Sequence, residues 1–252
     1  MIPIDLAGRT ALVTGATGEL GRAIARTLAR AGADVAVHYH RNQRMADLLV
    51  AEIRAMGRRA VPVQADITAK DSVAALKAVL EKDLALPDIV VANALIQYKW
   101  TTVLDQDLAD YESQFRSCVV QAVLLAKAFV PAMIEKQWGR VIGMNTECVM
   151  QYWHAQSAYS SGKRGMDGVL RVLAREVGPH SITVNQVAPG WTISENKPEH
   201  DGTKEYRRRV PLGRRGTDQE IANVVAFLAS DLASFISGAY VPVCGGNVMP
   251  GI

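Results

Sequence analysis

The chain has 252 residues, of which 49% are hydrophobic and 21% are charged, a composition typical of a globular domain rather than of a disordered, fibrous or membrane protein. Its net charge of +3, from 28 Lys and Arg against 25 Asp and Glu, is too small to indicate a nucleic-acid partner. We therefore expect a single domain over residues 1–252 that binds no nucleic acid.

The cysteines Cys118, Cys148 and Cys244 are widely spaced and form no CxxC pair, so we expect neither a disulfide framework nor a metal site. The N-terminus lacks the pattern of a secretory signal, and no apolar run approaches the roughly 18 residues that span a bilayer. We expect a cytoplasmic protein that binds no membrane. The basic run 207–209 is typical of a solvated surface, and we assign it no function.

From residue 10 onward, short β-branched runs alternate with longer segments of helical periodicity, which indicates an α/β fold with helices on both faces of a parallel sheet. Several of the runs are continuously apolar, as strands buried on both faces should be. The expected strands are residues 10–14, 34–39, 60–64, 88–92, 140–145, 182–188 and 240–243. The expected helices are residues 20–31, 44–56, 71–82, 107–136, 157–178 and 218–230.

The least regular segment is residues 189–216, which is rich in polar and charged residues. A movable flap over a substrate site is one interpretation of this segment, and an ordinary surface loop is the other. We name it the substrate-loop region.

A glycine turn joins the first expected strand to the first expected helix. Gly15, Gly18 and Gly21 let backbone N–H groups approach a pyrophosphate at the helix N-terminus, and Thr17 and Leu20 lie in the same turn. Chain reversal with close helix packing is the alternative. Because the turn opens the α/β alternation, we favour a dinucleotide site.

The end of the second strand reads His38-Tyr39-His40-Arg41 and contains no acidic residue that would bind the ribose of NAD. Basic groups at this position suit a 2′-phosphate, so NADP(H) is preferred over NAD(H), unless these residues are merely a polar strand exit. Asp66, after the third strand, is expected either to accept a hydrogen bond from adenine or to cap the next helix.

A phenol and an ammonium lie one helical turn apart in the pair Tyr159 and Lys163. A nearby ammonium lowers the pKa of a tyrosine, which makes Tyr159 a candidate acid and base for a carbonyl/alcohol substrate. Thr146 ends the fifth strand, where ligands of α/β sheets bind, and its hydroxyl can donate to the substrate oxygen. A turn residue at the strand end is the alternative for Thr146.

Together these motifs make the chain resemble the short-chain dehydrogenase/reductase family over essentially its whole length. The resemblance rests on the following segments and residues: 14–21, Asp66, 92–94, Tyr159, Lys163, 184–185, 188–190, 237–238 and 245–246.

The resemblance implies a Rossmann-like, doubly wound parallel sheet and an NAD(P)-dependent oxidoreductase that reduces a ketone or aldehyde or oxidises an alcohol. It also implies a homo-oligomer, a dimer or tetramer. Within it, Tyr159 is the acid/base, Lys163 lowers its pKa and holds the nicotinamide ribose, and Thr146 replaces the usual serine. The implied cofactor-binding residues are Gly15, Thr17, Gly18, Leu20, Gly21, His40, Arg41, Asp66, Ile67, Asn93, Ala94, Tyr159, Lys163, Pro189, Gly190 and Thr192.

Three residues depart from the family pattern. The glycine spacing resembles that of the extended branch and puts Glu19 at the usual middle glycine, so its carboxylate must point to solvent or cap the helix if it is not to repel the pyrophosphate. Leu95 replaces a glycine after Asn93 and Ala94. Cys118 stands where the family has an asparagine that anchors a proton-relay water, a role for which cysteine is a poor substitute.

The expected substrate-pocket residues are Gln97, Val149, Trp153 and Trp191, although aromatics in loops often serve packing alone. The three departures also motivate an alternative function, a non-catalytic NADP(H)-binding sensor or scaffold. Retention of Tyr159 and Lys163 argues against it. Enoyl reduction within the family requires a tyrosine seven residues before the lysine, and that position is Gln156.

Overall fold

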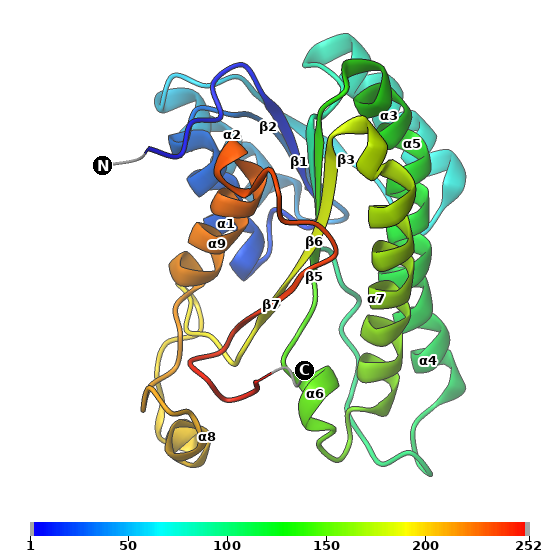
Figure 1. The fold of residues 1–252 in the computed structure, drawn as a ribbon. Helices are drawn as coiled ribbons and strands as arrows, with labels where there is room; N and C mark the ends of the chain where they lie inside the picture. The colour runs from blue at the N-terminus through cyan, green and yellow to red at the C-terminus, as the bar shows by residue number, and fades with distance from the viewer. Residues whose placement is uncertain (1–2, 250–252) are drawn as a thin grey trace.

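The computed structural model describes residues 3–249, and a seven-stranded parallel sheet forms the centre of that part of the chain (Figure 1). The strand order is β3-β2-β1-β4-β5-β6-β7, and every neighbouring pair is parallel. The strands are β1 (Thr10–Val13), β2 (Asp34–Tyr39), β3 (Ala60–Gln64), β4 (Ile89–Ala92), β5 (Gly139–Met144), β6 (Ile182–Pro189) and β7 (Tyr240–Val243).

Helices cover both faces of the sheet, as Figure 1 shows. One layer contains α1 (Glu19–Arg30), α2 (Gln43–Ala55) and α9 (Asp218–Ala229). The other contains α3 (Lys70–Asp83), α5 (Gln121–Lys136) and α7 (Ser157–Val177). The remaining α-helices among the described residues are α4 (Leu108–Phe115), α6 (Cys148–Gln151) and α8 (Lys204–Arg209), and three short 3₁₀ turns lie at Gly178–His180, Asp201–Thr203 and Asp231–Ala233.

Two apolar cores join these layers to the sheet, because successive strand residues point to opposite faces. In β1, Ala11 and Val13 pack with the core beneath α1, α2 and α9, whereas Leu12 packs with the core beneath α3, α5 and α7. Continuous burial along β1 and β4 follows from this arrangement and explains their unbroken apolar sequence.

The predicted doubly wound α/β fold is confirmed, but the region 107–136 is not one regular helix. It consists of α4, a five-residue π-helix at Arg116–Val120 and α5. The short helices α6 and α8 were not predicted. The predicted domain 1–252 includes residues 1–2 and 250–252, which lie outside the described residues.

Within residues 3–249, one continuous helix, Leu108–Lys136, is long and apolar enough to cross a membrane by length and composition. The expectation that no apolar segment approaches this length was therefore wrong. Leu125, Phe129 and Met133 of this helix lie in the core beside the sheet, and a core helix meets the same criterion as a membrane span.

The sheet has its topological switch point at β1, which pairs with β2 on one side and β4 on the other. The connections from these strands leave in opposite directions, so a crevice opens at the carboxyl ends of β1 and β4. This position is the one at which the glycine turn follows β1.

Candidate active site

The glycine turn passes very close to the end of β4. Gly15 has φ +60°, and a Cβ atom there would lie 2.9 Å from the Cα of Ala94. A Cβ on Gly21 would lie 2.2 Å from the carbonyl oxygen of Gly15. Both positions therefore require glycine to form the turn, and Gly18 then leads directly into α1.

The buried side chain of His38 holds the glycine turn through hydrogen bonds. The backbone N–H of Gly15 donates to Nδ1 of His38 over 2.9 Å, and Nε2 of His38 lies 3.1 Å from the carbonyl oxygen of Ala65. These two contacts fit a neutral ring with its proton on Nε2. Burial lowers the pKa of His38 to about 4, so the ring stays neutral. The sequence analysis assigned His38 no role beyond the strand exit.

The end of β4 is tied to the same turn through Thr14. The Thr14 hydroxyl donates to Oε1 of Gln121 over 2.7 Å and accepts from the backbone N–H groups of Asn93 and Ala94 over 2.8 and 3.0 Å. The Asn93 amide in turn donates to the Thr14 carbonyl over 2.9 Å. In this structure the Asn-Ala segment therefore fixes one side of the crevice, and Leu95 beyond it is partly buried against the core.

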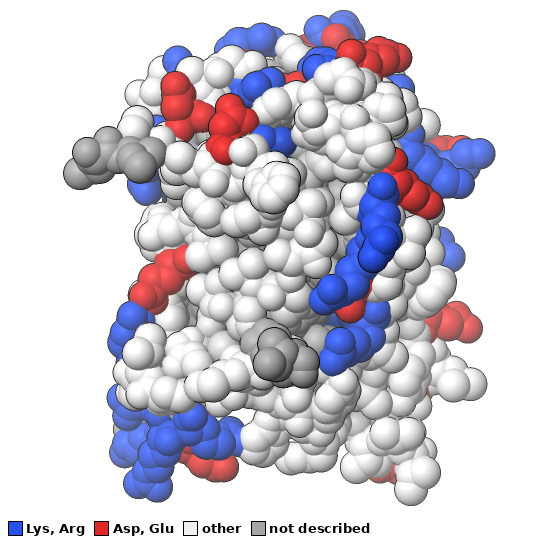
Figure 2. Space-filling model, in the orientation of Figure 1, with Lys and Arg blue, Asp and Glu red and all other residues white. Residues whose placement is uncertain are grey.

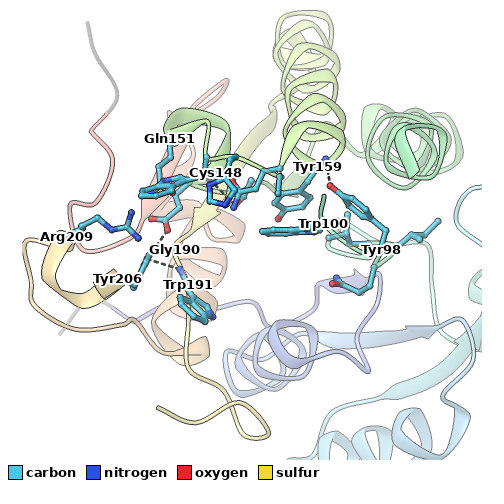
Figure 3. A pocket seen from close by; sticks show the side chains of 18 residues that line it. Tyr98, Trp100, Cys148, Gln151, Tyr159, Gly190, Trp191, Tyr206 and Arg209 are labelled. Atoms are coloured by element: carbon cyan, nitrogen blue, oxygen red, sulfur yellow. Dashed lines mark hydrogen bonds between the residues drawn. The ribbon is translucent and has the colours of Figure 1, made fainter. Parts of the chain in front are cut away.

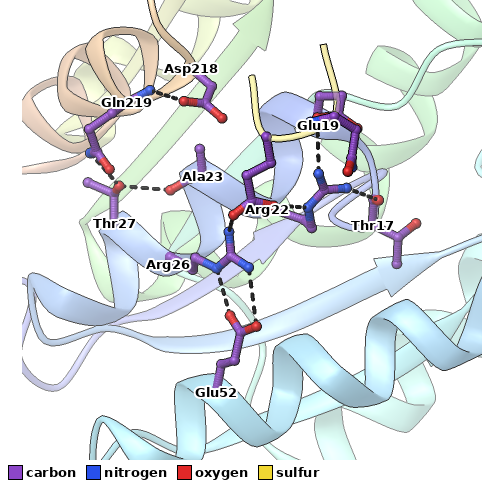
Figure 4. Close-up of polar contacts among 11 residues, drawn as sticks. Thr17, Glu19, Arg22, Ala23, Arg26, Thr27, Glu52, Asp218 and Gln219 are labelled. Atoms are coloured by element: carbon purple, nitrogen blue, oxygen red, sulfur yellow. Dashed lines mark hydrogen bonds and ion pairs between the residues drawn. The ribbon is translucent and has the colours of Figure 1, made fainter. Parts of the chain in front are cut away.

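Glu19, the first residue of α1, neither points freely to solvent nor caps the helix. Its carboxylate accepts from the Arg22 guanidinium over 3.0 Å and from the Asn196 amide over 2.9 Å, and Figure 4 shows the pairing with Arg22. Burial opposes ionisation, but hydrogen bonds from Asn196, Ser194 and Arg22 outweigh it and lower the pKa of Glu19 to about 2. Its negative charge thus lies beside a buried arginine.

The same ion-pair network ties the substrate-loop region to α1. Glu195 accepts from Arg22 over 3.0 Å and from Arg26 over 2.5 Å, and Arg26 also pairs with Glu52 of α2 (Figure 4). Through Glu195 and Asn196 the segment is held beside the N-terminal end of α1. We call these ion pairs, with Glu19, the crevice latch.

The side chains at the ends of β2 and β3 form a second polar group. His40 and Arg41 are exposed, whereas Ile67 is buried. The Asp66 carboxylate accepts from the backbone N–H and hydroxyl of Thr68 over 2.9 and 2.7 Å, so it closes the turn before α3. Burial opposes ionisation of Asp66, but the Thr68 hydrogen bonds and the charge of His40 give it a lowered pKa.

Two of the predicted catalytic side chains meet at the end of β5, where Thr146 and Tyr159 line one cavity and the Thr146 side chain is near enough to lower the pKa of Tyr159. Asn145 positions both elements: its amide donates to the Lys163 carbonyl of α7 over 3.2 Å, and its oxygen accepts from the Thr146 N–H over 2.9 Å. Thr146 itself is buried and also accepts from the Cys148 N–H over 3.2 Å.

The ammonium of Lys163 is held by a backbone carbonyl near Tyr159. It donates to the Met144 carbonyl over 2.5 Å and lies 5.9 Å from the centre of the tyrosine ring. Burial raises the pKa of Tyr159 and the neighbouring Cys148, Cys118 and Tyr240 raise it further, whereas the Thr146 side chain opposes the shift. Burial likewise lowers the pKa of Lys163. The phenol is therefore protonated at neutral pH.

Cys118 lies in the π-helix Arg116–Val120 and is fully buried. It is close enough to contribute to the electrostatics of both Lys163 and Tyr159. The approach depends on glycines of α7, because a Cβ on Gly165 would lie 2.6 Å from Val119 of the π-helix. A π-helix is often found at functional sites, and here it brings a thiol beside the catalytic pair.

A cavity of about 660 Å³ opens beside Tyr159 (Figure 3). Of the expected pocket residues, Gln97, Trp153 and Trp191 line it. Val149 is not among the residues that line it, and its side chain is fully buried in α6. Trp100 stacks on the Tyr159 ring with 5.7 Å between ring centres, which places an indole at the reacting end.

A buried carboxylate that the sequence analysis missed, Glu147, lies in the wall of the cavity directly after Thr146. Tyr206 of α8 donates to it over 2.9 Å and Asn247 over 3.0 Å (Figure 3 shows Tyr206). Burial raises the pKa of Glu147, and these hydrogen bonds oppose the shift. Its position at a strand end beside the predicted Thr146 was the available signal.

The remaining predicted residues begin the substrate-loop region. The Pro189 carbonyl accepts from the Glu147 N–H over 3.0 Å, and the Thr192 carbonyl accepts from Arg215. Gly190 lines the cavity, and a Cβ there would lie 2.4 Å from the Tyr206 hydroxyl. The structure therefore brings Pro189 and Gly190 to the site and points the backbone of Thr192 to Arg215.

Comparisons with known proteins agree with this geometry. A family model described as enoyl-(acyl carrier protein) reductase matches residues 15–247. The chain belongs to the short-chain dehydrogenase/reductase family. It is 36% identical over 98% of its length to the whole of 3-oxoacyl-(acyl-carrier-protein) reductase FabG from Pseudomonas aeruginosa. It is 35% identical over 97% of its length to 98% of the corresponding reductase from Synechocystis.

Solved structures of this family agree as well. A blue fluorescent protein from a metagenomic library, in complex with NADPH, has a TM-score of 0.90 and 30% identity over 97% of this chain and 100% of its own. A putative gluconate dehydrogenase from Agrobacterium tumefaciens has a TM-score of 0.91 and 27% identity over 99% of this chain and 100% of its own. The protein is an NAD(P)-dependent oxidoreductase, and these findings do not support a non-catalytic sensor or scaffold.

The crevice fits a dinucleotide on its own geometry. The N-terminus of α1 has Gly18 as its N-cap and no side-chain cap in the described part of the chain, so its first N–H groups face the crevice without a side-chain acceptor. A pyrophosphate is the kind of anion that such an end accepts. Gly15, Thr17, Gly18, Leu20 and Gly21 would hold it.

Proposed function

We propose that the protein reduces a ketone or aldehyde with NADPH, with the reverse alcohol oxidation favoured only at alkaline pH. The observation that carries the proposal is that the Thr146 hydroxyl and the Tyr159 phenol line the same end of one cavity. Two hydroxyls at one end of a cavity can both bind one carbonyl oxygen, which polarises the carbonyl and supplies the proton.

When bound, the nicotinamide dinucleotide supplies the hydride. Tyr159 then donates its proton to the oxygen, because its raised pKa keeps the phenol protonated at neutral pH. Thr146 donates a hydrogen bond to the same oxygen as negative charge develops. Lys163, buried beside the pair, would hold the ribose of the cofactor, and Trp100 limits the space over the phenol.

NADP(H) is the proposed cofactor in preference to NAD(H). His40 and Arg41 are exposed at the end of β2, where a 2′-phosphate would lie, and Arg41 offers a bidentate partner for it. Asn93 and Ala94 would form one wall of the adenine pocket. Asp66 and Ile67 would form the other, and Pro189, Gly190 and Thr192 would lie toward the nicotinamide.

The test is a screen of ketones and aldehydes in which turnover is measured as the loss of NADPH absorbance. The wild type should turn over at least one of them, and Tyr159→Phe should lose about 100-fold or more in kcat. Arg41→Gln should raise KM for NADPH about tenfold and leave KM for NADH within about twofold. Cofactor binding without turnover in the wild type would overturn the proposal.

The direction of the reaction gives a second test. Oxidation needs the phenolate of Tyr159, and its raised pKa makes this form rare at neutral pH. The oxidation rate should therefore rise as pH increases above neutral, while the reduction rate should not. Parallel pH profiles in the two directions would contradict the role given to Tyr159.

We also propose a small-molecule carbonyl or alcohol as the substrate, a cytoplasmic location and a homo-oligomeric assembly, with the single domain 1–252 and its substrate-loop region 189–216. Size-exclusion chromatography with light scattering tests the assembly. A monomer at micromolar concentration would contradict that part of the proposal.

A further inference from the structure

The cavity has a charged end that the proposed reaction does not use. Arg209, the last residue of α8, lines the cavity, and Figure 3 shows it at the side opposite Tyr159. Its guanidinium lies over the ring of Trp153, 3.8 Å from the ring centre. This cation–π contact holds the guanidinium beside the cavity without using its N–H groups in a conventional hydrogen bond.

Arg209 has donors without acceptors in the described part of the chain, residues 3–249. It forms no hydrogen bond or ion pair there, although its charge favours ionisation of Glu147. The hydrogen bonds that Glu147 accepts come from Tyr206 and Asn247 instead. The guanidinium is thus held in place by an aromatic ring, while its five N–H groups remain available to a bound anion.

The surface around this end of the cavity is basic. Arg207, Arg208 and Arg209 form the last turn of α8, and Figure 2 shows the corresponding Lys and Arg cluster at the lower left of the molecule. Positive potential at a cavity mouth favours entry of anions over cations. The charge and the open guanidinium edge therefore select the same chemical class of ligand.

We propose that Arg209 anchors a carboxylate of the substrate while the carbonyl of the same molecule lies at Tyr159 and Thr146. This inference rests on the proposed function and names its substrate class, an oxo acid whose carboxylate is separated from the ketone by a carbon chain. In the reaction the hydride adds to the carbonyl carbon and the Tyr159 proton to its oxygen. The carboxylate stays unchanged in the product, a hydroxy acid.

The experiment compares oxo acids with their uncharged methyl esters, using 4-oxopentanoate, 5-oxohexanoate and 6-oxoheptanoate as probes. For the chain length that fits, kcat/KM of the acid should exceed that of the ester about tenfold, mainly through KM. Arg209→Gln should bring this ratio to about one. Arg208→Gln is the matched control, because it changes the net charge equally but Arg208 does not line the cavity, and it should keep the ratio within about twofold.

Charge reversal sharpens the result. Arg209→Glu should prefer a ketone with a terminal ammonium over the acid of equal length, whereas Arg208→Glu should still prefer the acid. An acid-to-ester ratio near one in the wild type, or one that Arg209→Gln leaves unchanged, would overturn this inference and leave the proposed function standing. If the protein reduces no ketone, whether the probe is an acid or an ester, both the proposed function and this inference are overturned.

Discussion

The two sides of the crevice are held by different forces. The catalytic side is built from buried groups on β5 and α7: Asn145 fixes Thr146 and the backbone of Lys163, and the Thr146 hydroxyl meets Tyr159. The opposite rim is the crevice latch, whose Glu195 side chain is half exposed. Buried hydrogen bonds keep one geometry, whereas ion pairs with one half-exposed partner are weakened by salt.

This difference indicates that chemistry and access are separable in this enzyme. Changes on the buried side should reduce turnover at any ionic strength. Changes at the latch should alter the motion of the substrate-loop region and depend on salt.

The largest expected effect is on the buried side. Thr146→Val removes one of the two hydroxyls at the carbonyl oxygen and should lower kcat about 100-fold, with no dependence on salt. Thr146→Ser keeps the hydroxyl and is the matched control, which should retain kcat within about threefold. Equal losses in the two variants would show that Thr146 serves packing rather than the reaction.

The buried His38 beneath the glycine turn should make the stability of the fold depend on pH. Its folded-state pKa of about 4 lies below the unfolded value, so the unfolded chain binds a proton that the folded chain does not. The contribution of His38 to the free energy of unfolding is therefore fully present above about pH 6.5. It falls by about 3 kcal/mol as pH drops to 4.

Urea unfolding at several pH values measures this slope. His38→Gln cannot titrate and should flatten it relative to the wild type. His180→Gln, at a partly exposed histidine, should leave it unchanged. An unaltered slope in His38→Gln would mean that other groups cause the acid sensitivity.

At the latch, Glu195→Gln removes the ion pairs with Arg22 and Arg26. Hydrogen exchange of residues 193–197 should become about fivefold faster, because an exposed pair is worth at most about 1 kcal/mol. High salt should produce the same change in the wild type. Glu205→Gln on α8 is the control and should have no effect on this segment; salt-independent exchange in the wild type would argue against an ionic latch.

The smallest expected effect concerns Cys118. Cys118→Asn introduces an amide that can hold a water beside Lys163, so kcat should rise about threefold and its pH profile should change. Cys244→Ser is the control at a buried cysteine outside this cluster. If turnover and pH profile both stay as in the wild type, the thiol does not limit proton supply.

Much of the fold was predictable because its signals are local. Parallel strands buried on both faces have continuous apolar sequences, and the positions of Thr146 and Tyr159 follow from a strand end and a helix start. The π-helix was not predictable, since one extra residue in a turn leaves the apolar spacing of 107–136 nearly unchanged.

Contacts between side chains of elements far apart in the chain could not be predicted from the sequence either. No sequence pattern indicates that the Lys163 ammonium bonds to the carbonyl at the end of β5. Glu19 was expected to turn to solvent or cap α1, yet Asn196 and Arg22 bind it. Arg209 was assigned to a solvated surface, and only the packing of α8 against Glu147 shows that it lines the cavity.

The close approach of Gly190 and Tyr206 restricts how relatives of this chain can diverge. A methyl group at position 190 would collide first with the phenolic oxygen at position 206, so either substitution constrains the other. Gly190→Ala alone should displace α8 and with it the carboxylate anchor, whereas pairing it with Tyr206→Phe should restore much of the wall. Positions 190 and 206 are therefore expected to change together.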